Sequence, residues 1–329
     1  MTGVSNVAVT DDEAGIRLDR WFRRHYAELG HGQLEKMLRT GQVRVDGGRS
    51  KASARLEAGQ IVRVPPFTVS TTSRPRQAPP VTRSRDIEKL KELVIHLDDD
   101  VLAINKPPDL AVQGGTGLKK HLDGMLDDLR FGLTERPRLV HRLDKDTSGV
   151  LVLGRNAFAA AKLAAAFRDR TARKTYWALV VGVPRPRKGK IVSRIKKKGS
   201  GREDRGEKSK ADGKRGLTDY EVLESAGSEI AWLSLQPHTG RTHQLRVHCA
   251  ELGTPILGDG KYGGREAFLE GIPEAKKLHL HAQSLEIPHP RGGILRLQAA
   301  LPPTMAATWR FFGLETGARA RVSGHQNMA

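Results

Sequence analysis

The stretch HRLDKDTSGVLVLG, residues 141–154, places a group of charged side chains directly before a hydrophobic run. The run VLVLG has the length and the β-branched content of a strand that is buried on both faces. The Asp-Thr-Ser-Gly between the two parts is typical of a turn. One explanation is purely structural, with Asp144 or Asp146 capping that turn through its side-chain oxygens. The other explanation is catalytic, and the rest of the chain has to discriminate between the two.

Strand-like and helix-like segments alternate from residue 87 onward. Residues 101–107 (VLAINKP) and 174–183 (KTYWALVVGV) predict strands, and residues 156–170 predict an Ala-rich amphipathic helix. Further strands are expected in the later segments LSLQP, LHLHAQSLEI and ILRLQA. This mixture predicts an α+β fold with a large, mostly antiparallel mixed sheet.

A smaller α+β unit is expected at residues 16–66. Apolar residues recur at helical spacing in IRLDRWFRRHYAEL and again in GQLEKMLRTG, where Gly41 is placed to end the second helix. The segment QVRVDGGRS then predicts a hairpin, because Asp-Gly-Gly follows alternating valines. Helix, helix and hairpin in this order resemble the S-four-type RNA-binding domain, which is named after a ribosomal protein. The alternative is that the basic side chains of this unit only solvate a helix face. The expected RNA contacts are Arg17, Arg20, Arg24, Arg39 and Arg44.

Composition suggests the remaining boundaries. We expect residues 1–15 to form a flexible arm, and residues 67–86, which are rich in Pro, Ser, Thr and Arg, to form a linker. Residues 87–314 then form the larger domain, and residues 315–329 form a loose tail.

The positive charge of the chain is concentrated in two segments. The 329 residues carry a net charge of +19. Residues 16–66 hold 11 Lys and Arg against 5 Asp and Glu, and residues 185–216 hold 14 against 4. Charge gathered in this way indicates a polyanionic partner, with nucleic acid first and an anionic membrane surface second. The second segment lies between two expected strands, and we expect it to be a mobile insertion in the sheet.

Several other function classes are not indicated. Cys249 is the one cysteine, which excludes an internal disulfide and fits a reducing cytoplasm. No apolar run approaches the roughly 18 residues of a membrane span, and no signal peptide is evident. The Gly-x-Gly-x-x-Gly at residues 258–263 lacks the strand-and-helix context of a dinucleotide site, so it predicts a structural loop. Histidine spacing does not match a zinc site, so we expect neither a metal nor a cofactor.

Several motifs together favour the catalytic explanation. The quoted stretch is followed by KTY, by GRTHQLRVH and by GTPILGD with a later YG, and INKPPDLAV precedes it. In this order they resemble the RluA-type family of ribosomal RNA pseudouridine synthases over residues 95–300. The small unit in front is a familiar arrangement in that family, and VQGGTG at residues 112–117 favours the RluC-like branch. Asp109 stands where the family usually has Gly, and an Asp tolerates the left-handed turn expected there.

The resemblance implies the chemistry and the site residues. It implies that a uridine within RNA is isomerised: the glycosidic C–N bond breaks, the uracil turns, and a C–C bond forms. Asp144 is then the catalytic carboxylate, acting as a nucleophile or as a base at the ribose, and Arg246 pairs with it and keeps it ionised. Tyr176 stacks on the uracil and helps to remove its C5 proton. Arg142 fills the space that the flipped base leaves. The other expected substrate contacts are His141, Lys174 and Arg241.

The expected substrate is 23S ribosomal RNA in the assembling large subunit, and the enzyme is expected to be monomeric and cytoplasmic. Two alternatives remain open at this point. One is a pseudouridine synthase that acts on transfer RNA. The other is a non-catalytic RNA-binding ribosome assembly factor that retains the synthase fold.

Overall fold

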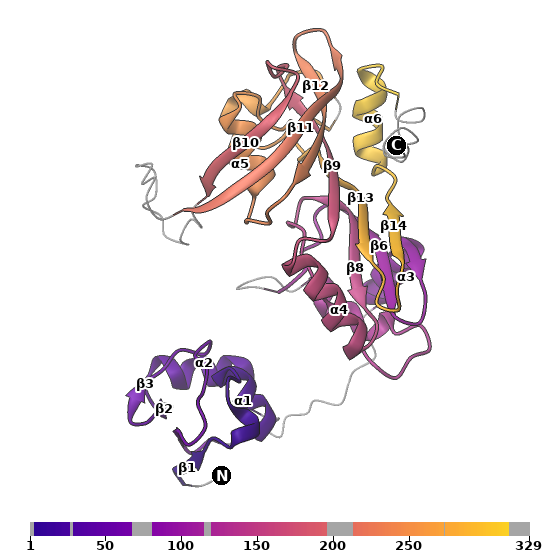
Figure 1. Ribbon diagram of the computed structural model, residues 1–329. Coiled ribbons are helices and arrows are strands. Elements are labelled where there is room, and N and C mark those ends of the chain that lie inside the picture. The colour runs from indigo at the N-terminus through magenta and orange to yellow at the C-terminus, as the bar shows by residue number, and fades with distance from the viewer. Residues whose placement is uncertain are drawn as a thin grey trace. The chain divides into compact units, whose positions relative to one another are not determined.

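The chain folds into two compact units, Met1–Pro80 and Val81–Ala329. Figure 1 shows the first unit in indigo and the second from violet to yellow. The computed structural model describes residues 3–26, 29–67, 81–114, 120–195, 213–272 and 274–315. Most of the expected linker, residues 68–80, lies outside these ranges.

The N-terminal unit packs two helices against a small sheet. The helices are α1 (Leu18–His25) and α2 (His31–Arg39), and Gly41 follows α2 with a φ of 71°. The sheet has the order β1-β4-β2-β3, with β1 at Ser5–Ala8, β2 at Arg44–Val45, β3 at Gly48–Arg49 and β4 at Ile61–Val64. Asp46 and Gly47 turn the predicted hairpin with φ values of 48° and 77°, as a two-residue turn requires. The two helices and the hairpin are therefore confirmed.

The expectation of a flexible arm at residues 1–15 is wrong for most of that segment. Strand β1 pairs antiparallel with β4, and a 3-10 helix follows at Asp11–Glu13. The Glu13 carboxylate is buried, where it accepts from Trp21 Nε1 at 2.9 Å and lies 2.6 Å from His25 Nε2. Burial opposes its ionisation, but the hydrogen bonds with His25 and Trp21 hold the pKa of Glu13 at about 2. A charged side chain with buried partners therefore fastens a segment whose composition suggested disorder.

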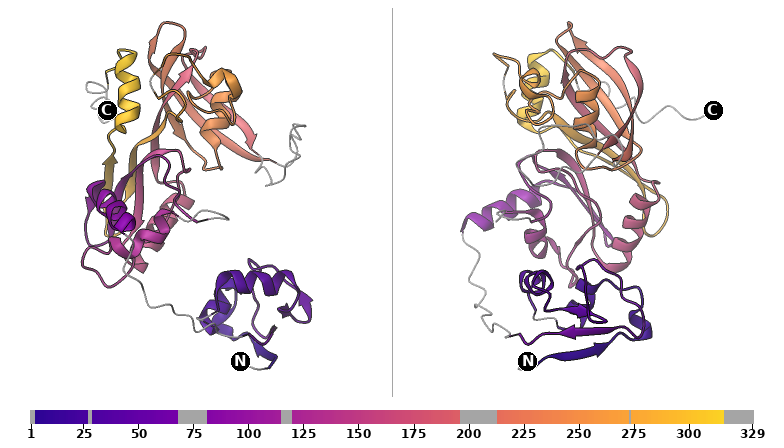
Figure 2. Two further views of the ribbon diagram at one scale, coloured as in Figure 1. Left: turned by 180° about the vertical axis from the view of Figure 1, so that it is seen from behind. Right: turned by 90° about the vertical axis from the view of Figure 1, so that its left-hand side faces the viewer.

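The C-terminal unit, Val81–Ala329, is built on one ten-stranded sheet of order β10-β11-β12-β9-β13-β8-β6-β5, with β14 beside β13 and β7 beside β8. Strands β8 and β13 run parallel, and the other adjacent strands run antiparallel. The predicted α+β class with a mostly antiparallel mixed sheet is confirmed (Figures 1 and 2). The strands are β5 (Val94–Leu97), β6 (Val101–Lys106), β7 (Arg138–Leu139), β8 (Ser148–Gly154), β9 (Arg173–Val181), β10 (Lys188–Ile195), β11 (Lys214–Ala226), β12 (Ile230–Pro237), β13 (Leu280–Pro288) and β14 (Ile294–Gln298).

Four helices accompany this sheet: α3 (Val81–Glu92), α4 (Ala157–Arg168), α5 (Gln244–Glu251) and α6 (Pro303–Phe311). Helix α4 lies in the predicted place and is capped by Asn156, whose side chain accepts from Ala159 N at 2.8 Å. None of the helices in the described part of the chain is long and apolar enough to cross a membrane.

Two predicted boundaries of the C-terminal unit also differ from the structure. Helix α3 begins at Val81, so the end of the expected linker 67–86 is helical. Strand β10 occupies Lys188–Ile195 and β11 begins at Lys214, so both ends of the expected insertion 185–216 belong to the sheet. Lys and Arg on the exposed face of β10 hid its alternation in the sequence. Residues 196–212 and the tail from residue 316 lie outside the described residues.

Candidate active site

Asp144 lies in the loop between β7 and β8, and its side chain is 20% exposed. All of β8 is buried, which fixes the position of this loop on the sheet. Gly149 has a φ of 109°, and a Cβ added there would lie 2.2 Å from the Ala282 carbonyl oxygen on β13. The glycine of Thr-Ser-Gly therefore permits the close approach of β8 and β13. Asp144 projects from a rigid support and remains accessible to a substrate.

Lys106, at the end of β6, ties two loops together. Its side chain is fully buried, and Nζ donates to the carbonyl oxygens of Pro107, Leu110 and Lys145 at 2.8–3.0 Å. Burial lowers the pKa of Lys106 to about 7, against the nearby charges of Asp146, Asp109 and Asp144. The INKPPDL loop and the HRLD loop therefore share one buried amine. Asp109 turns the first of these loops with a φ of 64°, which confirms the left-handed turn expected from the sequence.

Tyr176 lies on β9 and packs against two hydrophobic clusters of the C-terminal unit. One cluster gathers around β6 and β8, and the other gathers around β9, β12 and α5. Burial raises the pKa of the Tyr176 phenol, and the charge of Asp144 adds to that rise. A neutral phenol therefore stands beside the Asp144 carboxylate, at the junction of the two clusters.

The expected pairing of Arg246 with Asp144 is not what the structure shows. Arg246 lies on α5, and its Nε and Nη2 donate to the Asp259 carboxylate at 2.8 and 2.6 Å. Within the described residues, Arg246 forms no hydrogen bond or ion pair with Asp144. Burial opposes the charge of this guanidinium, but the hydrogen bonds and charge of Asp259, and then the charge of Asp144, raise the pKa of Arg246. Asp259 accepts both hydrogen bonds of the guanidinium because the GDGKYGG loop places its carboxylate within bonding distance of Arg246.

His243 is the imidazole that faces Asp144, with Nε2 lying 3.7 Å from Asp144 Oδ1. Its backbone is left-handed, with a φ of 56° directly before α5, and such strain in a non-glycine residue is concentrated at functional sites. Nδ1 lies 2.7 Å from Tyr262 Oη, and the Tyr262 ring lies under the Arg246 guanidinium at 5.2 Å. Burial lowers the pKa of His243 despite the charge of Asp144.

Sequence reasoning missed three of these residues. The histidine spacing indicates no role for His243, and the glycine pattern at residues 258–263 predicts only a structural loop around Asp259 and Tyr262. The loop assignment is confirmed, since Gly258 has a φ of 81° and its hydrogen atoms face the Lys277 carbonyl closely. The signal that could have found Asp259 and Tyr262 is their place in GTPILGD and YG, because these polar residues stand beside glycines that already shape the loop.

Of the four expected substrate contacts, His141 and Arg241 have other partners in the structure, and Arg142 is exposed. His141 does not point at a substrate: its Nε2 accepts from Val152 N at 2.8 Å, and its ring stacks on Phe167. Since β7 is only two residues long, His141 satisfies a strand amide that β7 does not reach. Arg241 Nε donates to the Arg215 carbonyl oxygen at 3.3 Å. Arg142 is exposed.

Lys174, the fourth expected contact, lies on the same side of β9 as Tyr176, two residues away. Burial lowers the pKa of the Lys174 amine, with a further contribution from Arg170. In the GRTHQ motif, residues 240–244, the Gln244 side chain forms four hydrogen bonds. Its partners are Thr239 Oγ1, Arg241 N, Leu217 O and Thr218 Oγ1, at 2.7–3.1 Å. Gln244 therefore fixes the GRTHQ loop onto β11.

The expected RNA contacts of the N-terminal unit are exposed, but they are not equally free. Arg17 pairs with Asp19 at 2.6 Å, and Arg24 lies 3.6 Å from Glu13. Arg44 donates to the carbonyl oxygens of Gly41 and Gly47. The two remaining expected contacts, Arg20 and Arg39, are exposed on α1 and α2.

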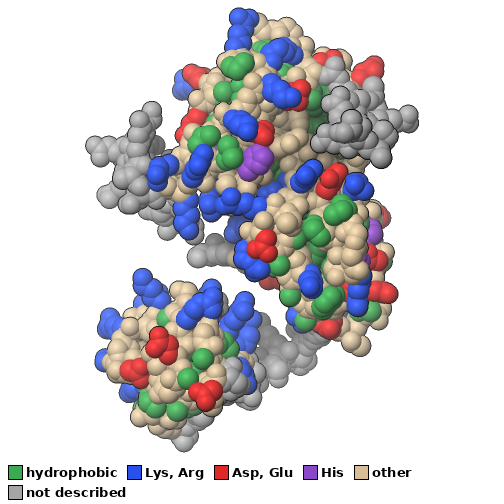
Figure 3. Space-filling model, viewed as in Figure 1, with side chains coloured by type: hydrophobic (Ala, Val, Ile, Leu, Met, Phe, Trp, Pro, Cys, Tyr) green, Lys and Arg blue, Asp and Glu red, His purple; other side chains and the backbone are tan. Residues whose placement is uncertain are grey.

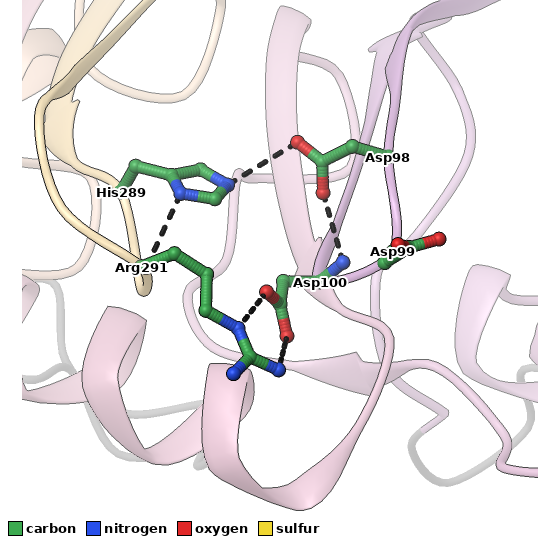
Figure 4. A pocket seen from close by; sticks show the side chains of 5 residues that line it. All are labelled: Asp98, Asp99, Asp100, His289 and Arg291. Carbon is green, nitrogen blue, oxygen red and sulfur yellow. Dashed lines mark hydrogen bonds and ion pairs between the residues drawn. The ribbon is translucent and has the colours of Figure 1, made fainter.

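A second polar cluster lies at the other end of β8 (Figure 4). It is lined by Asp98, Asp99, Asp100, His289 and Arg291. Because β6 and β8 are antiparallel, Val101 lies opposite Gly154, at the end of β8 far from Asp144. Arg291 Nε donates to Asp100 at 2.7 Å, and His289 Nε2 lies 3.2 Å from Asp98. These internal partners fasten the β13–β14 turn to the β5–β6 turn, so the cluster has a structural role.

The described residues contain no group of three or more His, Cys, Asp or Glu side chains that could hold a metal ion. The residues around Asp144 offer other chemistry: an accessible carboxylate, a neutral phenol, an imidazole and a buried guanidinium.

Comparison with known proteins identifies the class. The family model described as RNA pseudouridylate synthase matches residues 100–251, which contain Asp144, Tyr176 and Arg246. The chain belongs to this family of RNA pseudouridine synthases, which are isomerases. It is 35% identical to the ribosomal large subunit pseudouridine synthase C of Rickettsia conorii, over 82% of this chain and 88% of the relative. It is 36% identical to the protein of the same name from Vibrio cholerae, over 88% and 90%.

A solved structure has the same fold. The human RNA pseudouridylate synthase domain containing 4 aligns with a TM-score of 0.62 and 32% identity, covering 72% of this chain and 98% of that one.

Proposed function

We propose that this enzyme isomerises specific uridines of large-subunit (23S) ribosomal RNA to pseudouridine. The observation that carries the substrate is the pair of relatives named ribosomal large subunit pseudouridine synthase C. The alignment with the Vibrio cholerae protein covers 88% of this chain, so it includes part of the N-terminal unit as well as the catalytic unit. A shared unit with exposed arginines supports a large structured RNA as the substrate.

In this proposal Asp144 is the catalytic carboxylate. Its partly exposed position lets it reach the ribose of a uridine that has been turned out of the RNA, as a nucleophile or as a base. Lys106 holds the carbonyl of the next residue, and His243 faces the carboxylate. Both support the position of Asp144. Arg142, which is exposed on the same loop, fills the space that the base leaves.

Tyr176 stacks on the uracil in this proposal. The raised pKa of its phenol makes Tyr176 a poor proton acceptor, which supports stacking over base catalysis. The carboxylate of Asp144, once it is released from the sugar, is the better acceptor for the C5 proton. The proposal also includes a monomeric enzyme in the cytoplasm, where ribosomal RNA is assembled.

The decisive experiment is site-resolved mapping of pseudouridine in RNA from cells with and without the gene. We expect a small number of 23S positions to lose pseudouridine without the gene and to regain it with the wild-type gene, but not with Asp144→Asn. Loss confined to transfer RNA would replace the substrate proposal. Unchanged pseudouridine together with a defect in subunit assembly would favour a non-catalytic assembly factor.

A further inference from the structure

The exposed face of the β10–β11 hairpin has a charge pattern that changes along its length. Directly opposed residues of an antiparallel pair share a face, and the side chains of β10 that are exposed alternate with buried ones. Near the start of β10, Lys188 lies opposite Glu221 and Lys190 lies opposite Asp219. Lys188 Nζ and Glu221 form an ion pair at 3.5 Å. This part of the hairpin is therefore neutral overall.

The other end of the same face carries two arginines in direct opposition. Arg194 lies opposite Arg215, and both are exposed. Like charges directly opposite one another destabilise a sheet pair. Neither guanidinium has an acidic partner within the described part of the chain, and Arg194 Nη1 donates to the Gly213 carbonyl oxygen. The exposed face of the hairpin therefore becomes positively charged at this end.

Arg241 extends this pair toward the active site. Its Nε donates to the backbone oxygen of Arg215, and it stands two residues before His243. Gln244 and the close packing of Gly216 against His248 fix the loop and α5 onto β11. Figure 3 shows Lys and Arg side chains gathered over this end of the hairpin. The arginines are thus rigidly coupled to the element that presents His243 to Asp144.

We propose that Arg194, Arg215 and Arg241 form a phosphate-binding cluster for the RNA backbone beside the target uridine. The three guanidiniums offer planar forks of donors, which match phosphate oxygens, and a polyanion relieves the repulsion between Arg194 and Arg215. Charge complementarity selects RNA as the occupant, and in that respect the inference rests on the proposed function. The cluster adds a contact that does not depend on the N-terminal unit.

The test compares two double variants of the full chain on the same hairpin. Arg194→Gln with Arg215→Gln removes the unpaired arginines. Lys188→Gln with Lys190→Gln removes two cations that already face carboxylates, and it is the matched control. Binding to one 23S rRNA fragment is measured at several salt concentrations. Each lost phosphate contact flattens the slope of log K against log[salt] by about 0.7–0.9. The slope of the arginine variant should therefore be flatter than that of the wild type by about 1.4–1.8 for two contacts, whereas the control should keep the wild-type slope.

Thermal unfolding of the same proteins checks the geometry. Removing the Arg194–Arg215 repulsion should leave the melting temperature equal to that of the wild type or higher, whereas the control loses an ion pair and should not rise. An unchanged slope in the arginine variant, or equal losses in both variants, overturns the cluster. The proposal is also overturned if the wild type binds phosphatidylserine vesicles and the arginine variant loses that binding but keeps its binding to RNA. The cluster would then bind a lipid surface. Failure of the wild-type enzyme to modify 23S rRNA refutes the proposed function separately, because the slope measurement needs no turnover.

Discussion

The Arg246 guanidinium is bonded at two points to Asp259, and it lies over the Tyr262 ring at 5.2 Å from the ring centroid. Arg246 therefore acts on Asp144 through its charge, while its geometry is fixed by a different carboxylate. Asp144, the proposed catalytic residue, has no bonded Lys or Arg among the described residues and faces His243 at 3.7 Å, with a side chain that is 20% exposed.

Replacing Asp144 by Asn should abolish pseudouridine formation. The amide cannot act as a nucleophile or as a base at the ribose, and its size leaves the loop unchanged. Formation of pseudouridine by the purified variant, measured on an unmodified rRNA fragment, should fall below detection, while RNA affinity and the melting temperature stay near the wild-type values. Turnover by this variant would contradict the assignment of Asp144.

Arg246→Ala should damage both stability and turnover. It leaves Asp259, which is 1% exposed, as a buried carboxylate without its counter-charge. Breaking a buried pair in this way costs about 3–5 kcal/mol. Urea unfolding measures the loss, and Asp259→Asn in the same background should recover part of it. Arg241→Ala is the control for stability, since Arg241 bonds a backbone oxygen at the surface and its loss should lower the free energy of unfolding far less. Equal stability of Arg246→Ala and the wild type would contradict the structural pair.

Tyr262→Phe should slow turnover because His243 is then oriented less firmly. The change removes one hydrogen bond, between Tyr262 Oη and His243 Nδ1. Loss of such a bond is worth about 1 kcal/mol, or roughly a fivefold loss in rate. We expect the loss in kcat with KM nearly unchanged, because His243 faces Asp144 and not the RNA backbone. Steady-state kinetics on a short fragment tests this split, and an effect on KM alone would count against a positioning role.

Stability should fall as the pH drops below the ordinary histidine range. Burial lowers the pKa of His248 and of His281 to about 4, and neither side chain is exposed. The unfolded chain takes up protons near pH 6.5, whereas the folded chain takes them up near pH 4. The stability is therefore complete above about 6.5 and is lost between about 6.5 and 4, at up to about 1.4 kcal/mol per pH unit for each histidine.

Urea unfolding at pH 7.5, 6 and 5 measures this slope. His281→Asn retains a polar group toward Ser148 and should reduce the slope by about one proton. A slope that the substitution leaves unchanged would show that the titration of His281 differs little between the folded and unfolded states.

Deleting residues 1–80 should weaken RNA binding without removing the chemistry. The deletion ends at the boundary between the two compact units, and Asp144, Tyr176 and Arg246 all lie beyond it. We expect lower affinity for structured rRNA and a salt slope flatter by about two to four units, for a few lost phosphate contacts. Turnover on a short accessible fragment at high concentration should persist. Unchanged affinity and slope would mean that the arginines of the first unit only solvate its surface.

Local patterns in the sequence were enough to predict several turns, helix ends and strands of the fold. The Asp-Gly turn, the glycine after α2 and the continuous apolar run of β8 each depend on neighbours within a few residues, and each is present. The flexible arm failed as a prediction because Glu13 depends on partners 8 and 12 residues away on a helix. Strand β10 was hidden because one of its two faces is charged, which resembles a solvated coil in composition.

The candidate site shows the same limit. Motif positions led to Asp144, Tyr176 and Arg246, which lie on three separate elements. They could not show that Arg246 prefers Asp259, since the choice between two carboxylates depends on distances set by the glycine-shaped loop. They also could not show that His141 completes a strand ladder, because that role arises from the shortness of β7.

Strand β13 joins the two halves of the sheet, and its parallel contact with β8 begins where Gly149 meets Ala282. The residues of this contact, Ser148 and His281, are 133 positions apart in the chain. The support under Asp144 is therefore completed only by a strand that is synthesised late. A nascent chain that has released β8 but not β13 holds the HRLD loop without the strand that supports it. Such a chain already carries the exposed arginines of the N-terminal unit before the support under Asp144 is complete.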